Sequence, residues 1–473
     1  LESDGKGRTV SYKIKDGQGK LLQSRLGVSQ WDFHLPGKGA KPRLAYASCN
    51  GFSSSGLAQT VDPGAVWEKL KSQHAEKGAD AGPFSLLLMG GDQVYCDAVL
   101  ELDGLFTSWW NLMGRKDMEK YNPTAAEKGQ IQAFYEQVYL DQWAGRDATT
   151  QADVPKVKKT WPVAMMHMLA SVPSVMMWDD HDVFDGWGSY TDGRQTWPVY
   201  KVIFAEARRG FALFQQRGAT QNRSLLRKGA TRKDGDHFSF GIKFCDHVVL
   251  GMDNRTERTP TMIMQDRHWD ELKKWQTSTL QSVLDGAKAS ILVMSGVPVV
   301  WRKFGGLARN APTMADDVLD HWGDPAHEGD RDHLVYCLFD WAAAPKVRQV
   351  TLLSGDVHVG GMGVLEGRAG QHAGRQVAQI VSSGIVHPAP NWLQWQGVLV
   401  GSNEDQFEVR SLGITGKMMR PAGSRETYLR TRNFVTLKLG TDDKLWVNWI
   451  CEDTTYGQPY YAVPADGRVG GGG

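Results

Sequence analysis

The chain has 473 residues, of which 41% are hydrophobic and 23% are charged, values typical of one large globular domain or two ordinary ones. Its 54 Lys and Arg residues nearly balance 53 Asp and Glu residues, so no basic tract for nucleic acid is expected. No stretch approaches the roughly 20 apolar residues of a membrane span. A small anionic substrate stays compatible, because local charge attracts it.

The ends and the cysteines of the chain predict little about its location. The sequence begins at Leu1 without Met, so whether a signal peptide has been removed stays open, and both a cytoplasmic and an exported location are compatible. Five widely spaced cysteines form no CxxC pair, which is not the pattern of a disulfide scaffold. The oligomeric state is not predicted.

Short apolar runs predict strands that are buried on both faces. These runs comprise residues 44–47, 84–89, 173–178, 247–252, 291–294 and 350–353. Helix-like segments lie between several of them, and residues 269–284 carry an apolar stripe typical of a helix. Strands that alternate with helices predict an α/β sheet whose ligands bind beyond the C-terminal ends of the strands.

Three domain segments are expected. Residues 1–40 show partial alternation without matching helices and predict a small N-terminal β segment. Residues 41–460 form the main domain, which ends near a predicted hairpin at 434–450, and residues 461–473 are expected to be a flexible tail. Polar, Trp-rich residues 101–165 and 301–345 are interpreted as insertions over the site face.

Chemically active side chains gather directly after four of the predicted strands. They form the clusters Ser48-Cys49-Asn50, Gly91-Asp92-Gln93-Val94-Tyr95, Asp179-Asp180-His181-Asp182 and Gly355-Asp356-Val357-His358. Several buried carboxylates raise one another's pKa and resist ionisation unless a cation accompanies them. Two cations about 3.5–4 Å apart can share a bridging carboxylate and hydroxide and clamp the entering and leaving oxygens at phosphorus.

The segments ASCNG, GGDQVYCD, MMWDDHDVFDGWG, MDNRTER and LLSGDVHVGG resemble, in this order, the alkaline phosphatase D (PhoD-like) branch of the calcineurin-like metallophosphoesterases. The stretch DHWGDPAHEGDRDHL resembles a supporting segment of that branch. The resemblance implies a four-layer αββα sandwich core with long insertions. It also implies metal-dependent hydrolysis of phosphoric monoesters, diesters or both by a metal-bridging hydroxide acting on a small phosphorylated substrate.

The resemblance implies a role for each motif residue. Asp92 is expected to bridge two metals and so to be catalytic, with Cys49 and Tyr95 as thiolate and phenolate ligands of the first metal. Asp180 is expected on the second metal. Asp356 and His358 complete the ligand set.

Four further residues are candidates around the metals. His181 is expected to contact phosphate or to protonate the leaving group, and Asp179 is expected to support Asp180 or His181. Arg255 is a candidate phosphate ligand because its planar fork suits phosphate oxygens. A structural ion pair between Arg255 and the supporting residue Asp253 is the alternative.

The donor types suggest metal identities. Ser295-Gly296 stands where the superfamily usually has an isolated His, so the second metal sees mainly oxygen, which favours Ca²⁺, Mn²⁺ or Mg²⁺ over Zn²⁺. Phenolate and thiolate ligands together favour Fe³⁺ at the first position. The resemblance likewise implies iron plus calcium in a dinuclear centre.

Rival interpretations stay open. Cys49 is alternatively a buried core thiol, and Tyr95 a packed core tyrosine. The chain as a whole is alternatively a non-catalytic binding protein on this fold, or an enzyme with phosphotriesterase-type activity. A P-loop nucleotide-binding domain is excluded, because no GxxxxGK[ST] motif follows any predicted strand.

Overall fold

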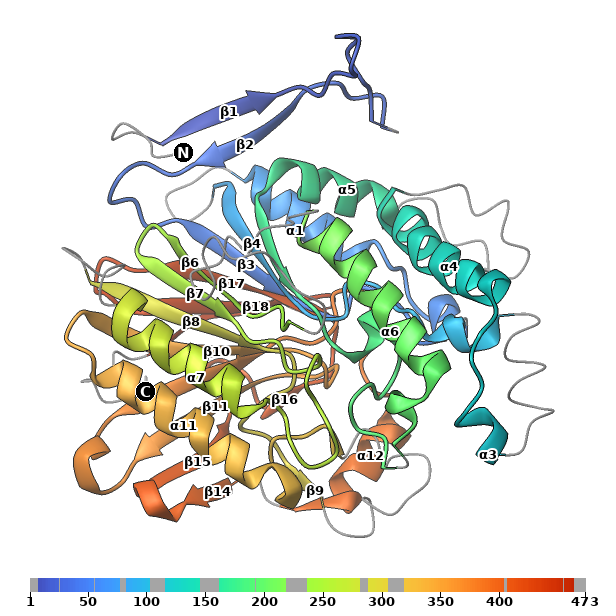
Figure 1. Ribbon diagram of the computed structural model, residues 1–473. Coiled ribbons are helices and arrows are strands. Elements are labelled where there is room, and N and C mark those ends of the chain that lie inside the picture. Colours follow the sequence, from blue (N-terminus) through green and yellow to red (C-terminus); the bar gives the residue numbers. More distant parts are fainter. Residues whose placement is uncertain are drawn as a thin grey trace.

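Two β-sheets pack face to face between two layers of helices in the computed structural model (Figure 1). The structure describes residues 7–24, 26–54, 56–76, 82–102, 115–144, 161–191, 193–217, 236–280, 288–304, 319–403, 406–453 and 455–462. Within these residues the expected four-layer αββα core is confirmed. The expected tail falls outside the described residues from residue 463 onward.

The first sheet has six strands in the order β19-β18-β17-β3-β4-β5. Its bounds are β3 Arg43–Ala47, β4 Phe84–Gly90, β5 Ser174–Met177, β17 Asn433–Leu439, β18 Leu445–Cys451 and β19 Thr455–Ala462. Strands β3, β4 and β5 are parallel. The expected C-terminal hairpin is the antiparallel pair β17–β18, and its strand β17 pairs with β3 in the interior of the sheet.

The second sheet has nine strands in the order β14-β15-β11-β12-β10-β8-β7-β6, with β16 paired to β11. Its bounds are β6 Phe240–Phe244, β7 His247–Gly251, β8 Ala289–Ser295, β10 Val347–Ser354, β11 Gly360–Gly367, β12 Gln376–Val381, β14 Gln406–Val409, β15 Ile414–Met419 and β16 Tyr428–Leu429. Strands β7, β8, β10 and β12 are parallel.

Alternating side chains divide the core into layers, because successive residues of a strand point to opposite faces. In β8, Leu292 and Met294 enter the core between the sheets, whereas Ile291 and Val293 pack toward the helices. Both faces of these strands are buried, which explains why their sequences are continuous apolar runs.

Helices cover both outer faces. The helices are α1 Ala65–Ala75, α3 Arg115–Met118, α4 Ala125–Ala144, α5 Trp161–Ser171, α6 Pro198–Gly210, α7 Asp266–Lys274, α11 Glu328–Ala343 and α12 Trp392–Gly401. Helices α1 and α5 cover the six-stranded sheet, and α7 and α11 cover the nine-stranded sheet (Figure 1). Two π-helical segments, Phe211–Gln215 and Trp275–Leu280, continue α6 and α7.

Helix α11 corrects one expectation about the insertions. Residues 301–345 were expected to lie over the site, but α11 is part of the core and buries Leu334, Leu338 and Trp341 against the sheet. Glu328 and Asp330 occupy its first turn, where acidic residues favour a helix N-terminus. The acidic first turn makes the segment look polar in the sequence, and this hides the helical spacing of the apolar residues that follow.

The N-terminal residues form a separate hairpin of β1 (Arg8–Tyr12) and β2 (Trp31–Leu35) beside α5 (Figure 1). The Tyr12 hydroxyl donates to Ala170 O at 2.7 Å, and the Trp31 ring meets His167 edge-on. A second short pair joins β9 (Lys303–Phe304) to β13 (Ser402–Asn403). The division into domains at residues 40 and 460 stays a prediction.

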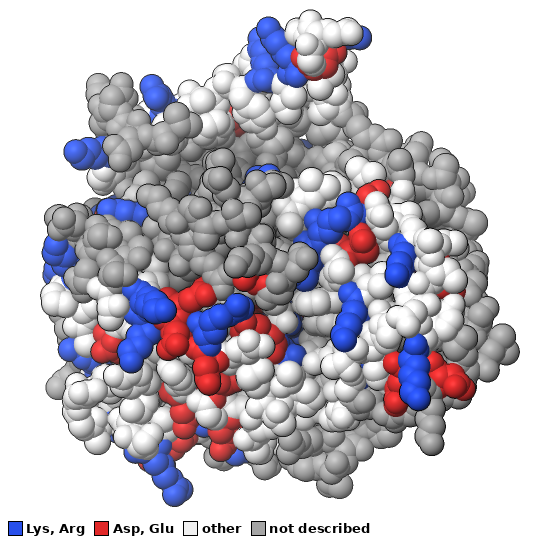
Figure 2. Space-filling model, in the orientation of Figure 1, with Lys and Arg blue, Asp and Glu red and all other residues white. Residues whose placement is uncertain are grey.

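The surface shows the mixed charge that the composition predicts. Acidic and basic side chains lie close together over much of the described part of the face in Figure 2. Among the described residues, no helix combines the length and apolar character needed to cross a bilayer.

Candidate metal centre

Four predicted ligands lie on sharp turns just beyond the strand ends. Cys49 and Asp92 each have φ of 53°, Asp356 has φ of 65° and His358 has φ of 53°, all in the left-handed region. Non-glycine residues adopt this region at a cost, and such residues concentrate at functional sites. The turns after β3 and β4 are joined, since Cys49 N donates to Gly91 O at 3.2 Å and Asn50 N donates to Asp92 O at 2.8 Å.

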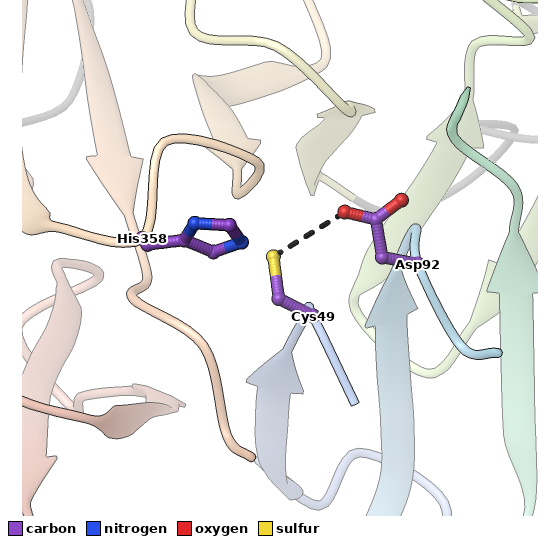
Figure 3. Close-up of side chains that lie close together, drawn as sticks. All are labelled: Cys49, Asp92 and His358. Carbon is purple, nitrogen blue, oxygen red and sulfur yellow. Dashed lines mark hydrogen bonds between the residues drawn. The ribbon is translucent and has the colours of Figure 1, made fainter. Parts of the chain in front are cut away.

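A first group of donors combines Cys49, Asp92 and His358, whose nearest ligand atoms all lie within 4.8 Å of one another (Figure 3). Cys49 Sγ is 3.5 Å from Asp92 Oδ2. The phenol of Tyr95 joins them, because its Oη is 3.2 Å from His358 Nε2. The structure therefore brings together four of the predicted ligands and places His358, which was not assigned to either metal, beside Cys49 and Tyr95.

A second group consists only of carboxylates: Asp92, Asp179, Asp180 and Asp356, again with ligand atoms within 4.8 Å. Asp92 belongs to both groups, which is the geometry required of a bridging ligand. Asp179 was expected to support Asp180 or His181, and the structure places its carboxylate within the donor group itself. An added Cβ on Gly296 would lie 2.0 Å from Asp179 Oδ2, so the absence of a larger side chain leaves room for this carboxylate.

Burial and mutual repulsion shift the pKa values of these donors. Burial and the charge of Asp180 raise the pKa of Asp92 well above its usual range, and burial and Asp179 do the same for Asp356. Burial, with Asp92, raises the pKa of the Cys49 thiol. Burial also lowers the pKa of His358, which keeps its ring neutral and able to bind a metal. Without a cation, this cluster resists ionisation.

Two carboxylate oxygens of the cluster have no hydrogen-bond donor. Asp92 Oδ1 and Asp179 Oδ2 are both buried and lack a partner among the described residues. A buried acceptor without a donor is costly, and a bound cation would satisfy it. The donor set therefore fits two metal ions, one with sulfur, nitrogen and oxygen donors and one with oxygen donors only.

His181 lies beside both groups. Its Nδ1 is 2.9 Å from Asp97 Oδ1, and its ring stacks on Tyr95 at 4.3 Å between centroids. Burial lowers the pKa of His181, but the carboxylates of Asp97 and Asp180 outweigh this, so the pKa lies well above 6.5. The raised pKa favours the protonated form of this ring in the metal-free protein. Its Nε2 lies 3.8 Å from Asp185 Oδ1.

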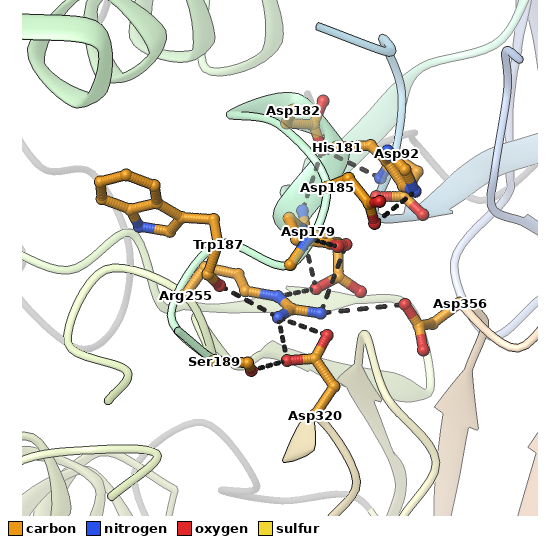
Figure 4. A network of polar contacts seen from close by, with 12 residues as sticks. Asp92, Asp179, His181, Asp182, Asp185, Trp187, Ser189, Arg255, Asp320 and Asp356 are labelled. Atoms are coloured by element: carbon orange, nitrogen blue, oxygen red, sulfur yellow. Dashed lines mark hydrogen bonds and ion pairs between the residues drawn. The ribbon is translucent and has the colours of Figure 1, made fainter. Parts of the chain in front are cut away.

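Arg255 lies among the carboxylates, with contacts to Asp179, Asp320 and Asp356 (Figure 4). The side chain is fully buried, at 0% exposure, and it pairs with Asp179 and Asp320. A role in phosphate binding stays a prediction. Asp253 does not pair with the guanidinium; its Oδ1 accepts hydrogen bonds from Trp178 Nε1 at 2.8 Å and from the backbone N–H of Arg255 at 3.0 Å.

Residues 18–316 match the family described as PhoD related phosphatase, which covers more than half of the chain. The chain belongs to this family. A curated relative, the uncharacterized protein YGR266W of Saccharomyces cerevisiae, is 26% identical over 395 residues. That match covers 72% of this chain and 53% of the yeast protein, so the chain spans about half of that relative's length.

One solved structure supports the fold of this chain, and a second is more distantly similar. The structure of PhoD aligns with a TM-score of 0.53 at 13% identity, covering 96% of this chain and 74% of PhoD. Purple acid phosphatase PPD1 from yellow lupin (Lupinus luteus) seeds aligns with a TM-score of 0.43 at 9% identity, covering 97% of this chain and 59% of PPD1.

Asp182 is a residue beside the donor groups to which sequence reasoning gave no role. Its fully buried carboxylate accepts hydrogen bonds of 2.9–3.2 Å from the backbone N–H groups of Asp92, Gln93, Val94 and Asp179. Gln215, from the π-helical turn, donates a further one at 2.7 Å. One carboxylate thus joins two of the three loops that carry the second donor group, those after β4 and β5. The sequence feature that could have identified Asp182 is its place in the Asp-Asp-His-Asp cluster.

Asp97 and His387 were also missed. Asp97 lies within the GGDQVYCD motif, so the motif itself was the available signal. His387 follows β12 and stacks on His358 at 3.6 Å and on Tyr95 at 5.6 Å between ring centroids. His387 has no comparable signal, because it stands in no polar cluster of the sequence.

Proposed function

We propose that this protein hydrolyses phosphoric esters with two metal ions that share Asp92. The observation that carries the proposal is the overlap of two donor groups at this single carboxylate. Membership of the PhoD related phosphatase family supports a phosphatase reaction. In each donor group the ligand atoms lie within 4.8 Å of one another, and a histidine of raised pKa lies beside them. A non-catalytic relative that had lost its activity would not be expected to keep this arrangement.

Fe³⁺ is the proposed ion for the group of Cys49, Tyr95 and His358, because only a strongly acidic ion lowers the pKa of a phenol and a buried thiol enough to bind both. Ca²⁺ is proposed for the carboxylate group, with Mn²⁺, Mg²⁺ or Zn²⁺ as alternatives. When bound, the ions would supply the Lewis-acid charge that activates water and neutralises phosphoryl oxygens.

The chain's own residues supply the proton. His181 carries it on a ring whose Nδ1 is fixed by Asp97 and whose Nε2 points away from that carboxylate. A general acid in this position protonates the oxygen of the leaving alcohol as the P–O bond breaks. Tyr95, stacked on the same ring, restricts its rotation. His181 is therefore proposed as the catalytic acid.

The proposed substrates are small phosphomonoesters and phosphodiesters, and a triester is the further alternative. The experiment is to remove metals, restore Fe³⁺ and Ca²⁺ separately and together, and measure hydrolysis of p-nitrophenyl phosphate and bis(p-nitrophenyl) phosphate. Turnover only with both ions supports the proposal. Metal binding without turnover on any phosphoric ester would establish the non-catalytic alternative.

A further inference from the structure

The guanidinium of Arg255 contacts four carboxylates and one backbone carbonyl. Nη1 lies 2.7 Å from Asp320 and donates to Trp187 O at 3.2 Å. Nη2 lies 3.4 Å from Asp180 Oδ1 and 3.8 Å from Asp356 Oδ1. Nε donates to Asp179 Oδ1. Four of the five N–H donors therefore make hydrogen bonds, and the contact of Nη2 with Asp356 is an ion pair at longer range.

Three of those contacts reach the carboxylate donor group, and the other two anchor the fork from outside it (Figure 4). Asp320 is itself held by Ser189 Oγ and by Arg258, so the outer anchor is part of the fold. No atom of Arg255 is exposed. A phosphate oxygen that approached Nη2 would compete with the carboxylates of Asp180 and Asp356 for this nitrogen.

We propose that Arg255 is a positioning residue that assembles the second metal site from Asp179, Asp180 and Asp356, and that it does not bind substrate phosphate. One planar fork reaches three carboxylates in fixed directions, which a point charge cannot do. Partners that orient metal ligands in this way govern metal affinity. The inference rests on the two-metal proposal.

If Arg255 acted only through its charge, its removal would change metal affinity in the opposite direction from that expected of a positioning residue. A cation beside the site repels a metal ion, so its loss would strengthen metal binding if the carboxylates kept their places. Positioning predicts weaker binding, because three neighbouring carboxylates without the fork repel one another and separate. The sign of the change therefore separates the two explanations.

The test measures Ca²⁺ binding to metal-free protein by equilibrium dialysis, with iron content measured in parallel. Arg255→Met is expected to weaken Ca²⁺ binding by about 10- to 100-fold, the usual effect of losing a partner that orients a ligand, while iron content stays near that of the wild type. Arg255→Lys keeps the charge without the planar fork, so it is expected to restore little of the Ca²⁺ affinity that Arg255→Met loses.

Arg258→Met is the matched control. Arg258 is a similarly buried cation of the same loop, but among the described residues it contacts one carboxylate, Asp320, at 3.3 Å. It should change Ca²⁺ affinity far less than Arg255→Met. Should Arg255→Met fail to fold, Asp320→Asn, which loosens the outer anchor and leaves the proposed ligands intact, is expected to weaken Ca²⁺ binding in the same direction.

Unchanged or tighter Ca²⁺ binding in Arg255→Met, or in Asp320→Asn if that variant is needed, would overturn the inference. So would full Ca²⁺ affinity in Arg255→Lys. Normal Ca²⁺ binding combined with weaker inhibition by inorganic phosphate would identify Arg255 as a phosphate ligand instead. Wild-type protein that binds no Ca²⁺ would contradict the proposed two-metal function itself, which is a different result from any of these.

Discussion

The backbone N–H of Asp92 donates to Oδ2 of Asp182 at 2.9 Å, although the two residues lie 90 positions apart in the sequence. The same oxygen accepts the N–H of Asp179, also at 2.9 Å. The loop after β4 and the loop after β5 are therefore held at a fixed separation by one buried carboxylate. The shared position of Asp92 in both donor groups depends on this separation.

Asp182→Asn should destabilise the protein and lower its metal content. An amide nitrogen in place of either oxygen leaves at least one backbone N–H buried without an acceptor, at a cost of about 1–3 kcal/mol each. Urea unfolding and elemental analysis measure the two effects. Unchanged stability together with wild-type metal content would show that the carboxylate does not hold these loops.

Tyr95→Phe and Cys49→Ser should each remove part of a visible absorption band of the iron-loaded protein. Phenolate and thiolate ligands transfer charge to Fe³⁺ at visible wavelengths, whereas phenylalanine cannot bind the metal. Absorption spectra of the wild type and both variants, at equal iron content, make the comparison. A wild-type spectrum with iron bound but no such band would rule out these two ligands.

Asp97→Asn should slow hydrolysis of esters with poor leaving groups far more than that of p-nitrophenyl phosphate. The carboxylate helps to hold the pKa of His181 well above 6.5, and its loss lowers that pKa and the fraction of protonated ring. A loss of about 100-fold for an alkyl phosphate is expected from weaker general acid catalysis. The alkaline limb of the kcat profile should also move to lower pH. Equal losses for both leaving groups would argue against His181 as the acid.

His247→Leu should reduce the loss of stability in acid. Burial, with Arg348, lowers the pKa of His247 from 6.5 to about 4. The unfolded chain therefore binds an extra proton between these values, so this residue destabilises the fold progressively as the pH falls from 6.5 to 4. The shift corresponds to about 3 kcal/mol. Unfolding free energies of both proteins across this window measure the difference, and a difference that is independent of pH would contradict it.

Strands and ligand motifs could be predicted because both faces of the central strands are buried. Such strands appear as uninterrupted apolar runs, and polar residues directly after them must lie at the sheet edge. Cys49 and Asp92 were found in this way, and the structure places their side chains 3.5 Å apart. The family resemblance supplied the four-layer arrangement, which no single strand pattern contains.

The remaining features depend on side-chain direction and tertiary packing. Asp182 accepts the N–H of Asp179 within a local capping box, but its hydrogen bonds to the loop after β4 depend on the tertiary positions of two loops. His387 reaches the site because the chain after β12 pairs with Cys49, as shown by the hydrogen bond from His387 N to Cys49 O at 3.1 Å. These contacts between distant segments are not specified by local sequence.

The central claim is tested most directly by the metal content and activity of Asp92→Asn. The account predicts two bound metal ions in the wild type, and in the variant a loss of metal and of phosphoric-ester hydrolysis while circular dichroism shows an intact fold. Wild-type turnover by a correctly folded Asp92→Asn protein would contradict a metal centre bridged by this carboxylate.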